Sequence, residues 1–230
     1  MDFGERHRFG LGTWKNTDPE ECRDTVRDAL EMGYRHIDTA QGYDNEAYVG
    51  DGIAAADIDR EDVFLATKVS TGNLAYDDVL ASTEESLDKL GTDYVDLLYV
   101  HWPINTYDAE DTMAAFQELH DRGAIERVGV SNFAVRHLEE ATEILDAPIF
   151  ANQVECHPYL QQEELRAYAR EHDHWLVAYS PLARGQFFDD PVLGEIAEKH
   201  GATVPQVALA WLLALETVAA IPKARGEHVT

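Results

Sequence analysis

The sequence predicts a single (β/α)8 TIM barrel, with α/β architecture and one domain over residues 1–230. Eight short apolar, β-branched runs alternate with longer amphipathic segments, which is the order of elements in a parallel α/β fold. This spacing gives about 29 residues per run, close to the roughly 30 residues of a βαβ unit. No run leads into a Gly-x-Gly-x-x-Gly turn, so a closed barrel is favoured over an open doubly wound sheet. No linker or shift in composition divides the chain.

The eight predicted strands are continuous apolar runs rather than alternating ones. They cover Gly10–Trp14, His36–Ala40, Val63–Val69, Val95–Trp102, Val128–Asn132, Phe150–Cys156, Leu176–Ser180 and Val218–Ile221. Phe64-Leu65-Ala66 and Leu97-Leu98-Tyr99-Val100 are apolar on both faces. This pattern is typical of parallel strands that helices cover.

The segments between these runs predict helices. Asp18–Met32 begins with Asp18 as N-cap and Pro19 at the first helical position, and Gly33 ends it. Similar patterns predict helices over Ser82–Leu90, Ala114–Leu119, Val135–Leu145, Glu163–Glu171 and Val192–Lys199.

The composition is strongly acidic and limits the partners that the protein can bind. Forty-four acidic residues and eighteen basic ones give a net charge of −26, which repels nucleic acid and anionic membranes. The acids are spread along the chain and only five bases are lysines, so we expect a protein from a halophile rather than a generally acidic bacterial protein.

The compartment is predicted from what the sequence does not contain. No apolar run approaches the ~18 residues that span a bilayer, and the first residues resemble no secretory signal. Cys22 and Cys156 are too few for a disulfide framework. A cytoplasmic protein is expected.

Ionisable residues occur at the ends of three consecutive predicted strands. Asp38 ends the second strand and Tyr43 follows it in the loop, Lys68 ends the third strand, and His101 ends the fourth. In a parallel barrel these ends meet at one rim, where the chemistry takes place. Each residue has a structural explanation of its own, such as a cap for Asp38 or a packed aromatic for Tyr43. Four such coincidences at one rim favour an active site.

These four side chains could together donate a proton to an oxygen. An ammonium at Lys68, held by the Asp38 carboxylate, should lower the pKa of the Tyr43 phenol. A neutral His101 could orient a carbonyl by donating to its oxygen. Because no activated nucleophile is evident, a hydride cofactor would have to supply the electron pair.

With these residues in place, the sequence resembles the aldo-keto reductase family from about Gly10 to Lys223. The motifs that carry the resemblance are Gly10-Leu11-Gly12-Thr13-Trp14, Asp38-Thr39-Ala40-Gln41-Gly42-Tyr43-Asp44-Asn45-Glu46, Thr67-Lys68, Asp96 to Pro103, Gly129 to Phe133, Asn152 to Glu155, Ala178 to Leu182 and Ile221-Pro222-Lys223. They are most similar to the short-looped prokaryotic members, such as 2,5-diketo-D-gluconate reductases.

The resemblance implies a reductase of small aldehydes, ketones or keto sugars that takes a hydride from NADP(H), with NAD(H) as the other option. Tyr43 would be the general acid, tuned by Lys68 and Asp38, and His101 would position the carbonyl. The cofactor would be held by Ser131, Asn132 and Gln153 at the carboxamide, Tyr179 at the ring, Ser180 and Leu182 at the pyrophosphate, and Lys223 at the adenosine phosphate. Trp14 and Trp102 would form walls of the substrate pocket. The family is commonly monomeric, so a monomer is expected.

The sequence departs from the family at its C-terminal end. The family continues after the position of Lys223 with a helix and often a loop, so we expect the barrel to lack its last helix and the chain to be a shortened form. Arg225 could supply part of the contact to a 2′-phosphate. The segment before Gly10 is short, and we expect it to leave little to fill the bottom of the barrel.

Two other functions stay open. A nicotinamide-binding auxiliary or regulatory protein of the same fold would bind the cofactor with little turnover, although it would not need a tuned phenol. A metal-dependent hydrolase could use His172, His174 and His157, but it lacks matching carboxylates at the strand ends. We therefore expect no metal.

Overall fold

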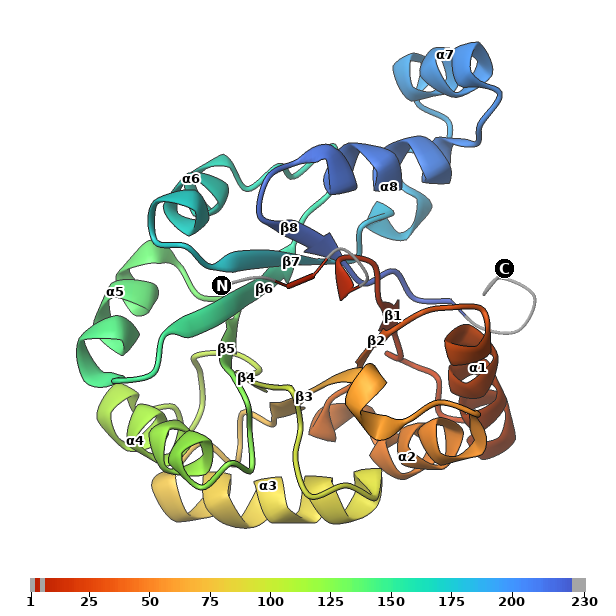
Figure 1. Ribbon diagram of the computed structural model, residues 1–230. Helices are drawn as coiled ribbons and strands as arrows, with labels where there is room; N and C mark the ends of the chain where they lie inside the picture. The colour runs from red at the N-terminus through yellow and green to blue at the C-terminus, as the bar shows by residue number, and fades with distance from the viewer. Residues whose placement is uncertain (1–2, 5–6, 225–230) are drawn as a thin grey trace.

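The computed structural model describes residues 3–4 and 7–224, and its centre is a parallel sheet of eight strands in chain order (Figure 1). The strands are β1 Leu11–Gly12, β2 His36–Asp38, β3 Phe64–Val69, β4 Leu97–Val100, β5 Val128–Ser131, β6 Ile149–Glu155, β7 Trp175–Tyr179 and β8 Val218–Ala220. Each predicted strand is confirmed.

The sheet closes on itself beside its first and last strands. Parallel bridges join Phe9 to Ala220 and Gly12 to Lys223. The Gly10 amide donates to the Ala220 carbonyl at 2.9 Å, and the Gly12 amide donates to the Pro222 carbonyl at the same distance. The predicted barrel, rather than an open sheet, is therefore confirmed.

The chain forms eight described helices, most of which lie around the barrel, while the one before the last projects away from it (Figure 1). They are α1 Pro19–Glu31, α2 Glu46–Ala55, α3 Tyr76–Leu90, α4 Ala109–Asp121, α5 Val135–Ile144, α6 Glu163–Glu171, α7 Pro191–His200 and α8 Val204–Ala214. Six of them confirm predicted helices, and Asp18 caps α1 by accepting from the Glu21 amide at 2.9 Å. The connection from β7 to β8 contains both α7 and α8, whereas the described residues after β8, 221–224, form no helix. Arg225 lies outside the described residues.

The sequence analysis did not predict α2 or α8. Gly50 and Gly52 interrupt the helical pattern of α2, because glycine is the poorest helix former after proline. α8 is almost wholly apolar, so it shows no polar stripe from which a helical period could be read.

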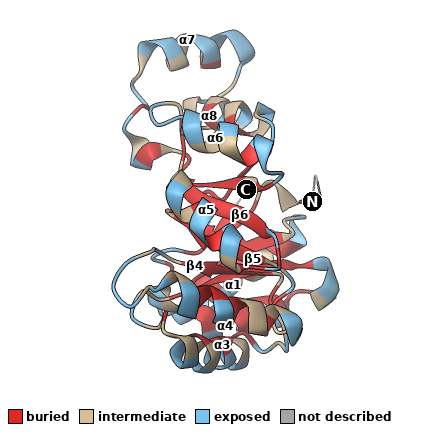
Figure 2. Cartoon of the chain, turned by 90° about the vertical axis from the view of Figure 1, so that its left-hand side faces the viewer, coloured by how far each residue is buried: buried red, intermediate tan, exposed pale blue. Residues whose placement is uncertain are grey.

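The barrel strands are the most deeply buried part of the chain (Figure 2). The expectation that little fills the bottom of the barrel is wrong, because Phe3 lies there with only 2% of its surface exposed. The centroid of its ring lies 4.9 Å from the ring centroid of Phe64 and 5.3 Å from that of Phe150. One aromatic side chain thus fills the place that was expected to stay largely unfilled.

No helix among the described residues is long and apolar enough to cross a membrane.

Candidate active site

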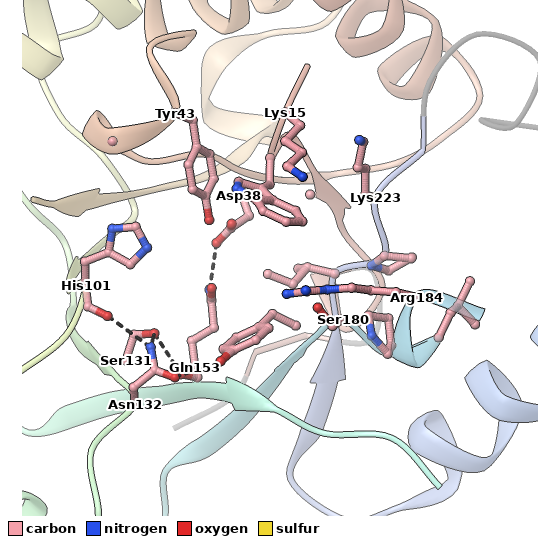
Figure 3. A pocket seen from close by; sticks show the side chains of 18 of the residues that line it. Lys15, Asp38, Tyr43, His101, Ser131, Asn132, Gln153, Ser180, Arg184 and Lys223 are labelled. Atoms are coloured by element: carbon pink, nitrogen blue, oxygen red, sulfur yellow. Dashed lines mark hydrogen bonds between the residues drawn. The ribbon is translucent and has the colours of Figure 1, made fainter. Parts of the chain in front are cut away.

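A cavity of about 670 Å³ opens at the C-terminal ends of the strands (Figure 3). Every predicted site residue lines it except Lys68, which is buried, with 1% of its surface exposed. The lining residues predicted from the sequence are Trp14, Asp38, Tyr43, His101, Trp102, Ser131, Asn132, Gln153, Tyr179, Ser180, Leu182 and Lys223. Residues from most of the strands therefore converge on one cavity, as a barrel allows.

The buried ion pair of Asp38 and Lys68 forms the floor of the site. Lys68 Nζ donates to Asp38 Oδ1 at 2.5 Å and to the Thr39 carbonyl at 2.7 Å. Gln153 Nε2 donates to the second carboxylate oxygen of Asp38 at 2.7 Å. Burial is the largest single effect on Lys68 and opposes its charge, but Asp38 and Tyr43 together outweigh it, so the pKa of Lys68 lies above its usual value. The ammonium therefore stays charged and fixed.

Tyr43 lies at the end of a single 3₁₀ turn, η2 Gln41–Tyr43, directly after β2. Lys68 Nζ is 5.0 Å from the centre of its ring, and the His101 ring meets it edge to face at 5.8 Å between centroids. The four residues predicted to act together are thus brought together, and Figure 3 shows Asp38, Tyr43 and His101 at the cavity.

The predicted direction of the Tyr43 pKa is wrong. Burial raises the pKa of the phenol above its usual value of 10.0, and the opposing effect of Lys68 is smaller. The error came from considering the ammonium without the loss of water that accompanies a closed site. The phenol consequently stays protonated at neutral pH, as a proton donor must.

His101 is neutral, as expected. Burial, reinforced by the charge of Lys68, lowers the pKa of its imidazole to about 3. The backbone carbonyl of His101 accepts from Asn132 Nδ2 at 3.1 Å, which ties the end of β4 to the end of β5. A neutral imidazole here can donate to an oxygen near the Tyr43 hydroxyl.

A second group of polar side chains lies across the cavity from Tyr43 (Figure 3). Ser131 Oγ donates to the Gln153 carbonyl at 2.8 Å, Asn132 Nδ2 donates to Ser131 Oγ at 2.9 Å, and Tyr179 donates to Asn132 Oδ1 at 3.0 Å. Asn132 adopts a left-handed conformation with φ 62°, which turns its amide toward the cavity. Amide and hydroxyl groups beside an aromatic ring suit a planar ligand that carries an amide.

The cavity also contains cations that the sequence analysis missed. Lys15 and Arg184 line it together with the predicted Lys223, and the Lys15 and Arg184 charges lie 4.4 Å and 5.3 Å from the centre of the Trp14 ring. Among the described residues that line the cavity, Asp38 is the only acid, and it is paired with Lys68. In a chain of charge −26, this local excess of positive charge marks a site for an anion. Two of the five lysines, Lys15 and Lys223, line the cavity and a third, Lys68, is buried beside it; the scarcity of lysine was the signal in the sequence.

One side of the cavity is lined by aromatic residues that are open to solvent. Trp14 and Trp102 keep 38% and 41% of their surfaces exposed and line the cavity with Tyr43 and His101. Ser180 and Leu182 lie farther round the rim, on the loop after β7.

The residues of the hydrolase alternative do not converge. The His174 ring lies 5.7 Å from that of Tyr168 on α6, whereas the His157 ring lies 6.2 Å from that of Phe187. The described residues contain no group of three potential metal ligands.

Comparison with known proteins gives consistent results. The Aldo/keto reductase family matches residues 8–228. The chain is 44% identical to the glyoxal reductase of Bacillus subtilis (strain 168), covering 96% of this chain and 79% of that protein. A crystal structure assigned as a 2,5-diketo-D-gluconic acid reductase B has a TM-score of 0.92 and 42% identity, covering 96% of this chain and 78% of the other. An aldo-keto reductase of Bombyx mori, solved in complex with NADP, has a TM-score of 0.87 and 34% identity, covering 94% and 79%.

Proposed function

Because the chain belongs to the aldo/keto reductase family, a family of carbonyl-reducing oxidoreductases, we propose that it reduces small aldehydes, ketones and keto sugars. The hydride would come from NAD(P)H, and Tyr43 would be the general acid. The observation that carries the proposal is the buried Asp38–Lys68 pair beside a protonated phenol and a neutral imidazole. Glyoxal, on which the Bacillus subtilis relative acts by its name, belongs to this substrate class.

The cavity fits a nicotinamide cofactor. Ser131, Asn132 and Gln153 would hold the carboxamide, and Tyr179 would stack on the ring. Ser180 and Leu182 on the β7 loop would meet the pyrophosphate, with Lys15 and Arg184 supplying positive charge. Lys223 would meet the adenosine phosphate, which favours NADP(H) over NAD(H). When bound, the cofactor supplies a hydride to the carbonyl carbon.

The residues of this chain would supply the proton. The His101 imidazole would donate to the carbonyl oxygen and hold it near the Tyr43 hydroxyl, between walls formed by Trp14 and Trp102. As negative charge develops on that oxygen, the phenol would transfer its proton. Lys68, anchored by Asp38, would stabilise the phenolate that remains. A regulatory protein would need no such arrangement, so that alternative is not favoured.

Tyr43→Phe tests this assignment. The variant removes the only proposed proton source, so kcat for glyoxal should fall by about 10²–10⁴-fold while the Kd for NADPH stays nearly constant. The rate is measured as the loss of NADPH absorbance. Repeating the assay with NADH over a set of aldehydes, ketones and keto sugars shows which cofactor the enzyme prefers. Undiminished turnover in the variant would refute Tyr43 as the acid.

The setting of the enzyme is also proposed. Cys22 and Cys156 are free, buried thiols whose pKa values are raised by burial, which suits a reducing cytoplasm. The charge of −26 disfavours association between copies at low salt, which supports a monomer, and it suits the high-salt interior of a halophile.

A further inference from the structure

The turn that carries Tyr43 has little structure of its own. η2 is one turn long and no side chain caps its first residue. Its backbone bonds run from the Tyr43 amide to the Ala40 carbonyl at 3.0 Å and from the Asp44 amide to the Gln41 carbonyl at 3.3 Å, and Asp44 is in the left-handed region with φ 55°. Short 3₁₀ turns have poor hydrogen-bond geometry, so other contacts must keep the phenol in place.

The side chain of Gln41, two residues before Tyr43, supplies four such contacts. Its Oε1 accepts from the Ser70 amide at 2.9 Å and from Asn73 Nδ2 at 3.3 Å. Its Nε2 donates to the Ser82 carbonyl at 3.1 Å and to Ser86 Oγ at 3.2 Å. A glutamine amide has two donor hydrogens and one acceptor oxygen, and here all of them are used to join the turn to the start of the β3–α3 loop and to α3.

The same network reaches the strand that carries Lys68. The single hydrogen of Ser86 Oγ has two acceptors, Glu46 Oε2 at 3.2 Å and the Ser82 carbonyl at 3.1 Å. Thr67 Oγ1 donates to Glu46 Oε1 at 2.6 Å. Thr67 precedes Lys68 on β3, and Glu46, Thr67 and Ser86 are all buried. Gln41 thus belongs to a polar network that fixes the phenol's turn relative to the ammonium's strand.

The other flank of the turn is held in a comparable way. Asn45, with 1% of its surface exposed, accepts from Thr39 Oγ1 at 2.8 Å and donates to the carbonyls of Thr13 and Asn16 at 2.9 and 3.0 Å. With that flank fixed, the position of Tyr43 depends on the Gln41 flank.

We propose that Gln41 is a positioning residue for proton transfer: its four hydrogen bonds hold the Tyr43 hydroxyl at the place where it can protonate the carbonyl oxygen. The inference rests on the proposed function, because it assigns to Gln41 an effect exerted through Tyr43. Gln41 does not line the cavity, so it touches neither substrate nor cofactor. Its loss should therefore affect the chemical step and leave binding unchanged.

The test combines Gln41→Met with Tyr43→Phe and the double variant. Methionine keeps the length and volume of glutamine and removes its hydrogen bonds. We expect kcat for glyoxal to fall by about ten- to a hundredfold, as a displacement near 1 Å can cause. The KM for glyoxal and the Kd for NADPH should change by less than about twofold.

Gln117→Met is the matched control. Gln117 is also half-buried and also joins two segments, since it donates to Asp121 Oδ1 at 2.9 Å and accepts from the amides of Asp146 and Ala147 at 3.1 and 2.8 Å. It lies on α4, outside the cavity lining. The control should lose comparable thermal stability and keep its kcat.

The double variant distinguishes positioning from a structural role. If Gln41 acts through Tyr43, adding Gln41→Met to Tyr43→Phe should lower kcat little further, because the phenol is already gone. A multiplicative loss would overturn the inference, as would a wild-type kcat in the single variant. If Tyr43→Phe loses activity and Gln41→Met keeps it, only the positioning role of Gln41 is refuted. If Tyr43→Phe keeps its full activity, the proposed function is refuted. If Gln41→Met does not fold, the test uses Ser86→Ala, which removes one of the hydrogen-bond partners of Gln41. A kcat that is lowered severalfold in this variant supports the positioning role. An unchanged kcat contradicts it.

Discussion

At the residue scale, burial controls the protonation of both groups that face the carbonyl oxygen. The pKa of His101 is lowered to about 3 and that of Tyr43 is raised above 10.0. The imidazole of His101 is neutral at any pH above its pKa, and the phenol of Tyr43 is protonated at any pH below its pKa. From weakly acidic to alkaline pH, His101 is therefore neutral and Tyr43 protonated, as the proposed proton transfer requires. The exclusion of water produces both forms; the charge of Lys68 reinforces it at His101 and opposes it, with a smaller effect, at Tyr43.

The expected consequence is a pH profile of carbonyl reduction with no break near the ordinary imidazole pKa of 6.5. The measurement is kcat/KM for glyoxal at saturating NADPH, with loss of activity expected only above pH 10, where the phenol ionises. Circular dichroism must accompany it. Unfolding exposes His36 and His101, which then take up protons below pH 6.5, so stability falls as the pH falls through that range. An acid limb near pH 6.5 in a still-folded protein would show that His101 titrates normally.

The sequence predicted which residues meet at the cavity, because a barrel imposes their meeting place. Asp38, Lys68 and His101 each lie within one residue of the end of a strand, and parallel strand ends share one rim. Burial was not readable in the same way, and this is why the direction of the Tyr43 pKa was predicted wrongly. Lys15 and Arg184 were missed because Lys15 lies in a turn and Arg184 in a short 3₁₀ helix, η4 Ala183–Gly185, outside the strands, and no strand period reveals that these segments enter the cavity.

At the scale of elements, α2 shows why a poor helical sequence can still be a required helix. A Cβ at Gly50 would lie 2.6 Å from the Leu90 carbonyl oxygen at the end of α3, and one at Gly52 would lie 2.7 Å from the Arg23 carbonyl oxygen on α1. Both glycines allow α2 to approach its neighbours closely, so the low helix propensity that concealed α2 in the sequence is a consequence of its packing. α2 begins at Glu46, just after the turn with Tyr43, and its packing also supports the site.

Gly50→Ala should therefore destabilise the protein, although alanine is the better helix former. Backbone atoms must move to accept the methyl group, at a cost of about 1–3 kcal/mol. Gly194→Ala is the matched comparison, because Gly194 lies inside α7 with nothing within 4 Å of an added Cβ, and there a gain of roughly 0.5–1 kcal/mol is expected. Urea denaturation of both variants measures the difference. If both substitutions stabilise the protein equally, the contact between Gly50 and the end of α3 is not close enough to exclude a methyl group.

At the scale of the whole molecule, charge is distributed in two opposing patterns. The chain carries −26 overall, while the cavity rim gathers Lys15, Arg184 and Lys223 around the paired Asp38. The general excess of acid destabilises the compact state by self-repulsion, and the local excess of base attracts an anionic cofactor. The fold class was predictable from the spacing of the apolar runs and the missing Gly-x-Gly-x-x-Gly turn, whereas the positions of Lys15 and Arg184 at the cavity required the structure.

Screening should consequently stabilise the fold. As the Debye length falls from about 10 Å at 0.1 M salt to about 3 Å at 1 M, repulsion among surface carboxylates weakens, so the thermal midpoint and the turnover of glyoxal should both rise with KCl up to molar concentrations. Differential scanning calorimetry and the NADPH assay over the same salt series measure the two responses.

Sucrose at matched osmolality is the control, because it stabilises by exclusion from the protein surface and screens no charge. The stabilisation by sucrose should change little with added salt. A thermal midpoint that does not depend on KCl would mean that the carboxylates are too far apart to destabilise the fold, and it would remove the support that the acidic surface gives to a halophilic setting.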